Sequence, residues 1–482
     1  MDLAAENAAL KVALAAKDEA LASTNARVAE LEELVTKLRE ELGRNSTNSN
    51  LPPSSDGPGK SRNQRKAERK RRKDKGKKRG GQPGHSGSHR KLLPPEQVDD
   101  FVELYPERCE SCWESLPKLF DALARRYQFI ELYPLAARTT EYRRHAVVCP
   151  CCGHKTRAAY DNNVIPRFTF GPRLMSAVVL LTGVYHLSRR NAVGLLRDLL
   201  GVRISLGAVS AIEKRLSDAV EPAVAEAWTR AMNAEVKHTD GTSWLRAGVM
   251  LSLWTVATSM VTVFKIVEDG RAKTLKALFT LKRGVLVSDR ATSLKFWAMK
   301  RRQVCWAHLL RKFISFSERD GPTGAIGREL VEYTAIVFHY WHDFQDGKLS
   351  RAELRRRIAP VRLQFEAVLR RAQTAKIRRL SGSCADVLAH AEALWTFVDR
   401  PGVEPTNNHA ERELRAFVLW RKRSFGTQSE RGNLFAERLM SVAHTARKQG
   451  VAILKFLTAC CEAHFDDRDA PSLFDRDYKA VA

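Results

Sequence analysis

The sequence predicts a multidomain protein of mixed α+β and α structure, in which an α/β core follows several smaller modules. Three observations predict this class. The first 43 residues are rich in helix-forming residues and hold a seven-residue apolar repeat, and two Cys-x-x-Cys pairs lie further along the chain. From residue 231 onwards, apolar runs of strand length alternate with helical patterns. At about 150 residues per domain, 482 residues leave room for roughly three domains.

The chain is strongly basic, with a formal net charge of +26 and a pI near 9.9. This balance favours an anionic partner, nucleic acid more often than a membrane surface, and disfavours cationic partners. The longest uncharged run, residues 247–264, is rich in Val, Ser and Thr, which indicates two strands rather than a membrane span. Nine cysteines and no leader-like N-terminus predict a reducing, cytoplasmic location, at the nucleoid if the partner is DNA.

Residues 1–43 are expected to form one helix, because the segment has no Pro and its only Gly is the last residue. Apolar residues recur in it every seven positions, which is the pattern of a coiled coil and would make the protein a homo-oligomer. An amphipathic helix packed on its own chain has a similar pattern, so that alternative stays open. The main series is Leu14, Leu21, Val28, Val35 and Leu42.

Residues 44–92 are expected to form a linker and a disordered basic arm. The linker part is rich in Asn, Ser, Pro and Gly, and residues 60–79 hold 13 Lys or Arg against two acids. Such a run cannot bury a core, and it neutralises phosphates whatever the base sequence. We therefore expect a DNA-contacting arm, although a solvated tail has the same composition. The residues assigned to DNA here are Arg69, Lys70, Arg71 and Arg72.

Residues 93–165 are predicted to form a zinc-ribbon-like module. Two thiolates separated by two residues can face one tetrahedral zinc ion, and the chain has two such pairs. The 36-residue spacer between the pairs is long, and strand patterns at 127–133 and 139–148 indicate a β-insert. Four unrelated buried cysteines are the alternative, and Cys151 is expected to be a bystander. The expected ligands of one structural zinc ion are Cys109, Cys112, Cys149 and Cys152.

Residues 166–230 are predicted to be helical, because apolar residues recur at helical spacing. A short break precedes Ser205, whose hydroxyl is expected to cap the next helix. Short helices joined in this way suit either a helix-turn-helix-like DNA-binding segment or a plain helical bundle, and periodicity does not separate the two. Helical patterns also cover about 315–400, as an insertion in the core, and a C-terminal segment at 431–482.

Residues 231–430 are predicted to form the α/β core. The expected elements are strands at 235–240, 249–257 and 260–267, a helix at 271–280, and strands at 284–289 and 303–308. Three antiparallel strands, a helix and two more strands are the opening order of an RNase H-like domain. In that order the first and fourth strands are neighbours, so the acids that follow them, Asp240 and Asp289, are expected to meet.

Two carboxylates held this close repel each other unless a cation lies between them. A pair of divalent ions relieves the repulsion and also supports in-line displacement at a phosphodiester, for which Glu411 at the start of a later helix is the expected third acid. Basic residues on or after that helix are expected to hold a DNA backbone, namely Arg412, Arg415, Arg421 and Lys422. The structural alternatives are a turn residue for Asp240, a helix cap for Asp289 and an ion pair with Arg415 for Glu411.

Several segments of the chain resemble transposases of the insertion-sequence 66 family, and the resemblance extends from residue 1 to about 465. The segments are NSTNSNLPPSSD, GGQPGH, the two cysteine pairs, HTDGTSW, VSDRATS, CWAHLLRKF, NNHAERELRAFVLWRKRSFGTQSERG and SVAHTARKQG. Two departures stand out: many relatives have Glu where this chain has Gly241, and a Gly is common where it has Trp113, so the first cysteine turn is expected to be less regular. We expect His308 to support the site without ligating metal.

The resemblance implies a DDE transposase with an RNase H-like catalytic domain. It maps the catalytic acids to Asp240, Asp289 and Glu411, holding two magnesium or manganese ions. The expected activity is recognition of terminal inverted repeats, cleavage at the element's ends and strand transfer to target DNA. Small accessory proteins of the same element are further expected partners, and no membrane partner is expected. The alternatives are a non-catalytic DNA-binding regulator derived from a transposase and an RNase H-like nuclease.

Overall fold

The computed structural model describes residues 92–132, 136–160 and 169–479, together with residues 11, 17–19, 21, 22 and 25. The predicted coiled coil and the basic arm with Arg69, Lys70, Arg71 and Arg72 therefore lie outside the described residues, apart from those few positions. Contacts divide the chain into two compact units, each described here by itself. One comprises Met1–Gly57, Arg143–Gly194 and Ile204–Ala482, and the other Pro58–Tyr142 and Leu195–Arg203.

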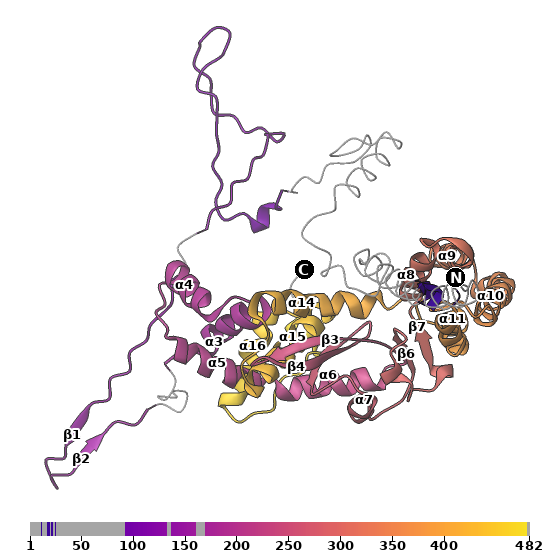
Figure 1. Cartoon of the computed structure of the whole chain (residues 1–482). Coiled ribbons are helices and arrows are strands. Elements are labelled where there is room, and N and C mark those ends of the chain that lie inside the picture. The colour runs from indigo at the N-terminus through magenta and orange to yellow at the C-terminus, as the bar shows by residue number, and fades with distance from the viewer. Residues whose placement is uncertain are drawn as a thin grey trace, which may run out of the picture. The chain divides into compact units, whose positions relative to one another are not determined.

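A five-stranded mixed sheet forms the centre of the larger unit (Figure 1). Its order is β5-β4-β3-β6-β7, with antiparallel pairing among the first three strands and parallel pairing of β3 with β6 and β6 with β7. The predicted pairing of the first and fourth strands is thus confirmed. The strands are β3 (Val236–Arg246), β4 (Val249–Ala257), β5 (Thr262–Val267), β6 (Val285–Ser288) and β7 (Arg302–Val304).

Helices cover both faces of this sheet because its strands alternate apolar side chains between the two faces. On β4, Trp254 and Val256 pack against α6 (Glu221–Asn233) and α7 (Ala272–Leu278). Leu251 and Leu253 point the other way, against α14 (Asn408–Ser424) and α15 (Glu430–Gln449). Figure 1 shows α14 on one side of the sheet and α6 and α7 on the other. Both faces of the sheet are therefore buried.

The remaining helices flank this core. The segment before the sheet is helical, as predicted, and the Ser205 hydroxyl accepts a hydrogen bond from the Ala208 N–H at 3.1 Å. Its elements are α3 (Pro172–Val179), the π-helical turn η3 (Leu180–Val184), α4 (Arg189–Leu200) and α5 (Leu206–Ala219). The insertion comprises α8 (Trp306–Ser317), α9 (Gly321–Gln345), α10 (Arg351–Thr374), α11 (Ser381–Leu388), α12 (Ala391–Leu394) and α13 (Thr396–Asp399), and α16 (Ile453–Phe465) follows α15.

Three of the predicted strands are shorter than predicted or absent from the described residues. No strand occupies residues 127–132, and 139–148 contributes only β1 (Ala146–Val148), which pairs with β2 (Lys155–Arg157). The strand predicted at 303–308 ends at Val304, because Trp306 begins α8. An apolar run of this length suits a buried strand or the first turn of a buried helix equally well, and periodicity does not distinguish them.

Helix α15 covers the open edge of β5 with polar side chains. The N–H groups of alternate β5 residues each donate to a side chain of this helix. The pairs are Thr262 with Thr445 Oγ1 at 3.1 Å, Phe264 with Ser441 Oγ at 3.0 Å, and Ile266 with Glu437 Oε1 at 2.5 Å. Two strand residues advance about 6.6 Å and four helix residues about 6 Å, so the two repeats stay in step. The edge is thereby closed to pairing with another strand. Within the described part of the chain, no helix is long and apolar enough to span a membrane.

Replacing Thr445 with Val keeps the shape of the side chain and removes two hydrogen bonds. The Thr445 hydroxyl accepts one from the Thr262 N–H and donates the other to the Thr262 carbonyl. The variant is expected to lower the free energy of unfolding by about 1–3 kcal/mol, because the buried Thr262 N–H loses its acceptor. Urea unfolding measures the change. Thr458→Val is the matched control, since the Thr458 hydroxyl bonds the Leu454 carbonyl within its own helix. Equal losses in both variants would contradict a specific role for the edge contact.

Candidate active site

Strands β3 and β6 place the first two predicted acids at the same end of their parallel pair. The last paired residues are His238 and Val287; Asp240 lies two residues beyond on β3, and Asp289 follows the last residue of β6. The prediction that the first strand ends at Asp240 is wrong, because β3 continues to Arg246 in a hairpin with β4. The acid therefore stands where β3 extends beyond its neighbour β6.

The three predicted acids act on one another electrostatically. The pKa of Asp240 is raised to about 8, first because the carboxyl is buried and then because the charges of Asp289 and Glu411 repel its ionised form. The Gly241 N–H donates to Asp240 Oδ1 at 2.9 Å, and Arg311 is also nearby; both oppose the rise. The three half-buried acids thus form an anionic cluster in which the positive charge of Arg311 does not offset the effect of burial and of the other two acids on Asp240.

The glycine after Asp240 is required by the neighbouring strand. Gly241 lies opposite Trp254, and a Cβ at this position would come within 2.8 Å of the Trp254 indole. The Glu that many relatives have here would force this indole to move. The structural alternative for Asp289, a helix cap, holds in part. Its Oδ1 accepts a hydrogen bond from the Ala291 N–H at 2.9 Å, in the turn before the short helix η4 (Thr292–Leu294). The other carboxylate oxygen has no such role in this turn.

Glu411 lies in the first turn of α14, where the helix dipole favours a carboxylate. Arg311 on α8 lies 3.2 Å from Glu411 Oε2, and His308 Nδ1 lies 3.5 Å from Oε1. Glu411 thus pairs with Arg311 on α8, not with Arg415 as the structural alternative expected. His308 was expected to support the site, and it lies beside Glu411. Arg311 was not predicted from the sequence, because it comes from a helix about a hundred residues earlier.

Asn407 fixes the start of α14 against the sheet. It occupies the N-cap position, but its side chain does not cap the helix. The amide Nδ2 donates instead to the Thr239 carbonyl at 2.8 Å, one residue before Asp240. The Asn407 N–H donates to Cys305 Sγ at 3.1 Å. These two bonds hold the helix that carries Glu411 beside the strand that carries Asp240.

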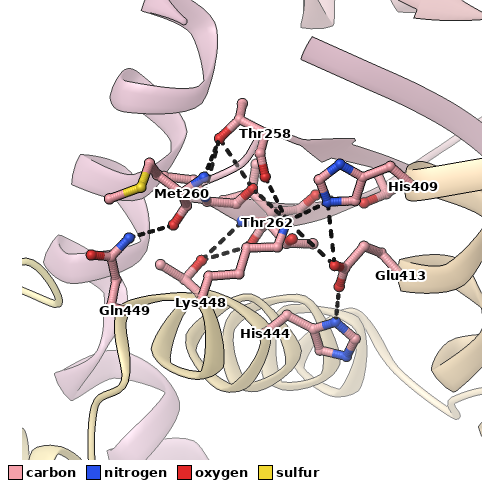
Figure 2. A network of polar contacts seen from close by, with 12 residues as sticks. Thr258, Met260, Thr262, His409, Glu413, His444, Lys448 and Gln449 are labelled. Carbon is pink, nitrogen blue, oxygen red and sulfur yellow. Dashed lines mark hydrogen bonds and ion pairs between the residues drawn. The ribbon is translucent and has the colours of Figure 1, made fainter. Parts of the chain in front are cut away.

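A second cluster anchors the opposite side of the same helix (Figure 2). Glu413 Oε2 accepts a short hydrogen bond from His444 Nδ1, and Lys448 Nζ lies 3.3 Å from Glu413 Oε1. Lys448 also lies 2.8 Å from His409 Nε2 and donates to the Thr258 carbonyl at 2.7 Å. Burial raises the pKa of Glu413, but the contacts with His409 and His444 and the charge of Lys448 outweigh burial and lower it. The cluster ties α14 to α15 and to the β4–β5 turn.

The basic residues assigned to DNA do not share one environment. Arg412, Arg415 and Lys422 are exposed along α14. Arg421 is half-buried and bonds Thr242 Oγ1 at 3.2 Å and the Ser243 carbonyl and hydroxyl, so it packs the end of α14 onto β3. A cavity of about 440 Å³ adjoins the segment after α14, and its lining includes none of the three acids.

The two cysteine pairs form turns with the same hydrogen bonds. The Cys109 N–H donates to the Glu114 carbonyl and the Trp113 N–H to the Cys109 carbonyl, each at 2.9 Å. Cys149, Gly153 and His154 repeat this arrangement at the same distances. Trp113 adopts φ 62° where Gly153 has φ 72°, so the expected irregularity of the first turn does not appear.

Backbone hydrogen bonds in these turns lower the pKa of one thiol in each pair. The donors are Cys112 and Ser111 for Cys109, and Cys152 and Cys151 for Cys149. Thiolates favoured in this way suit a zinc ion. The pairs belong to different compact units, so one zinc site built from Cys109, Cys112, Cys149 and Cys152 stays a prediction.

Comparison with known families places the chain among transposases. Residues 167–434, more than half of the chain, match the Transposase IS66 family. The chain belongs to this family, as the resemblance of its motifs predicts. Residues 2–91 match a family of unknown function, DUF6444. No curated protein matches the chain.

Asp240→Asn is expected to stabilise the metal-free protein in alkaline solution. The folded protein raises the pKa of Asp240 from 3.8 to about 8, so the stability that this group contributes is fully present below pH 3.8. That stability is lost as the pH rises through about 8, and the ionised carboxylate therefore destabilises the protein most near pH 9. Removing about 1 kcal/mol of repulsion would raise Tm by about 2–4 °C. Thermal melts in a chelator at pH 6 and pH 9 measure this difference, with the exposed Asp399→Asn as control. A gain no larger at pH 9 than at pH 6 would contradict the electrostatic cause.

Glu413→Gln tests the cluster in Figure 2. A lowered carboxyl pKa contributes stability above its ordinary value of 4.5, and that stability is lost as the pH falls through the lowered value. The variant is expected to lose about 1.5–3 kcal/mol at pH 7 and to show a shallower loss of stability below pH 4.5. Urea unfolding between pH 3 and pH 7 measures both. The exposed Glu392→Gln should leave the wild-type profile unchanged.

Proposed function

We propose that the protein is the transposase of a bacterial insertion sequence, which binds terminal inverted repeats and catalyses metal-dependent DNA cleavage and strand transfer. The observation that carries the proposal is the burial of Asp240 beside the charges of Asp289 and Glu411, which together raise its pKa to about 8. Family membership supports transposase activity in general, and this cluster supplies a place for it within the matched residues.

The donor set fits magnesium or manganese. Three carboxylates offer the hard oxygen ligands that these ions prefer, and cations would relieve the repulsion at Asp240. Two ions held by Asp240, Asp289 and Glu411 would activate the attacking oxygen and stabilise the leaving oxygen of a phosphodiester. The mixed sheet, with Asp240 on β3 and Asp289 directly after β6, supports an RNase H-like domain of the DDE type.

The chain's own residues position these acids and the substrate. Asn407 holds the start of α14 against β3, and Arg311 orients the Glu411 carboxylate. The exposed Arg412, Arg415 and Lys422 would contact DNA phosphates near the acids, while Arg421 holds α14 to β3. No covalent protein intermediate is needed, because water and then the freed 3′-hydroxyl serve as nucleophiles.

The N-terminal modules would bind and pair the DNA ends. We expect Arg69, Lys70, Arg71 and Arg72 to contact the phosphate backbone, with an affinity that falls steeply as salt rises. A structural zinc ion held by Cys109, Cys112, Cys149 and Cys152 would fold the ribbon-like module. A coiled coil at 1–43 would pair subunits across two ends, and accessory proteins of the element would assist.

The alternatives differ in what they do to DNA. A non-catalytic regulator would use the basic arm but would not need three acids placed together. An RNase H-like nuclease would cut DNA without joining ends. The raised pKa of Asp240 beside two further acids favours a functional site and so disfavours the regulator.

Asp289→Asn is expected to abolish end cleavage and joining, a loss of at least about 100-fold, while it preserves DNA binding. The assay uses the full chain, magnesium or manganese, and a duplex carrying the element's own end, with binding measured in the same mixtures. Asp399→Asn should keep wild-type cleavage. Equal cleavage by Asp289→Asn and the wild type would contradict the catalytic assignment. Cleavage without joined products would indicate a nuclease, and binding without cleavage in every mixture, even with the neighbouring gene products added, a regulator.

A further inference from the structure

A second set of metal-binding side chains adjoins the carboxylate cluster. Cys305, His308 and Glu411 each offer one ligand atom, and these atoms all lie within 4.8 Å of one another. Cys305 precedes the first turn of α8, His308 lies within that turn, and Glu411 lies in the first turn of α14. The starts of two helices therefore bring a sulfur, a nitrogen and an oxygen ligand together.

One ring nitrogen of the imidazole in this set lacks a hydrogen-bond partner. His308 Nδ1 is buried and makes no hydrogen bond within the described part of the chain, an arrangement that is rare for a buried polar atom. It lies 3.5 Å from Glu411 Oε1, outside good hydrogen-bond geometry. Ligand atoms about 2.0–2.1 Å from a tetrahedral zinc ion lie roughly 3.3–3.4 Å apart. The pair is thus spaced as two ligands of one ion would be.

The chemistry of the three ligands selects the metal. Magnesium prefers oxygen ligands and has little affinity for a thiol, whereas zinc accepts sulfur, nitrogen and oxygen together. We propose that Cys305, His308 and Glu411 bind a zinc ion, separate from the magnesium ions of the proposed active site and from the cysteine turns. On binding, the Cys305 thiol releases its proton to solvent as the sulfur–zinc bond forms, and the fourth position is left for water.

The site shares Glu411 with the proposed active site, and its consequence for activity rests on that proposed function. A carboxylate bound to zinc beside Cys305 and His308 is withdrawn from the magnesium ions. Zinc is therefore an inhibitor that competes for one acid, and its removal restores the acid to the cluster. Arg311, 3.2 Å from Glu411, holds the carboxylate when zinc is absent.

Metal binding tests the site without reference to activity. Cobalt(II) replaces zinc and reports a bound thiolate by its charge-transfer absorption. The full-length wild type is expected to bind one more equivalent of cobalt or zinc than Cys305→Ser and His308→Gln, because the cysteine turns are intact in all three. Cys384→Ser, at a buried cysteine of the insertion core, is the matched control and should bind as the wild type does. Thermal melts check that each variant is folded. If Cys305→Ser does not fold, the comparison of the wild type with His308→Gln decides the test.

Equal stoichiometry in the wild type, Cys305→Ser and His308→Gln overturns the proposal. The second arm adds zinc to the end-cleavage assay at fixed magnesium. Zinc is expected to inhibit the wild type at concentrations about tenfold or more below those that inhibit His308→Gln, since one of three ligands is lost. Equal inhibition of both overturns the competition for Glu411. If the wild type binds the additional equivalent of zinc or cobalt but neither it nor any variant cleaves DNA, the metal site stands and the proposed function fails.

Discussion

The burial of Asp240 beside two further carboxylates is a cost that the rest of the core must offset. Burial first, and then the charges of Asp289 and Glu411, oppose its ionisation and raise its pKa to about 8. The ladder between β3 and β6 holds two of the three acids in place. The third is held by the contacts of α14, where Asn407 bonds β3 and Glu413 is fixed by α15. The surrounding structure thus stabilises an arrangement that its central charges oppose, as is common at functional sites.

Helix α14 divides its first turns between two environments. Glu411 lies toward Arg311 and the other acids, and its neighbours at 409 and 413, four residues apart, lie toward α15 and the β4–β5 turn. The same helix therefore carries one carboxylate that a cation would have to balance and another whose charge Lys448 already balances. The two carboxylates are only two positions apart, so helical geometry alone separates their roles.

The adjacency of the first two acids was predictable from the sequence, because the order of the elements fixes which strands are neighbours. The extent of β3 was not, since it depends on pairing with β4 beyond Asp240. Nor was the role of Asn407, whose side chain suits a helix cap but bonds a strand far away in sequence. The contacts of Arg311 and His444 join distant elements, and no local pattern marks them. Local sequence patterns predict helices, strands and helix caps, whereas these long-range contacts depend on how the elements pack.

The closure of β5 by α15 affects where the protein can be divided. The match to the transposase family ends at residue 434, before Glu437, Ser441 and Thr445 reach the edge strand. A fragment cut at that boundary would keep all three acids and lose the side chains that cover β5, as well as His444 and Lys448. Its open strand would be free to pair with other chains, so a fragment expected to resist such pairing must extend through α15.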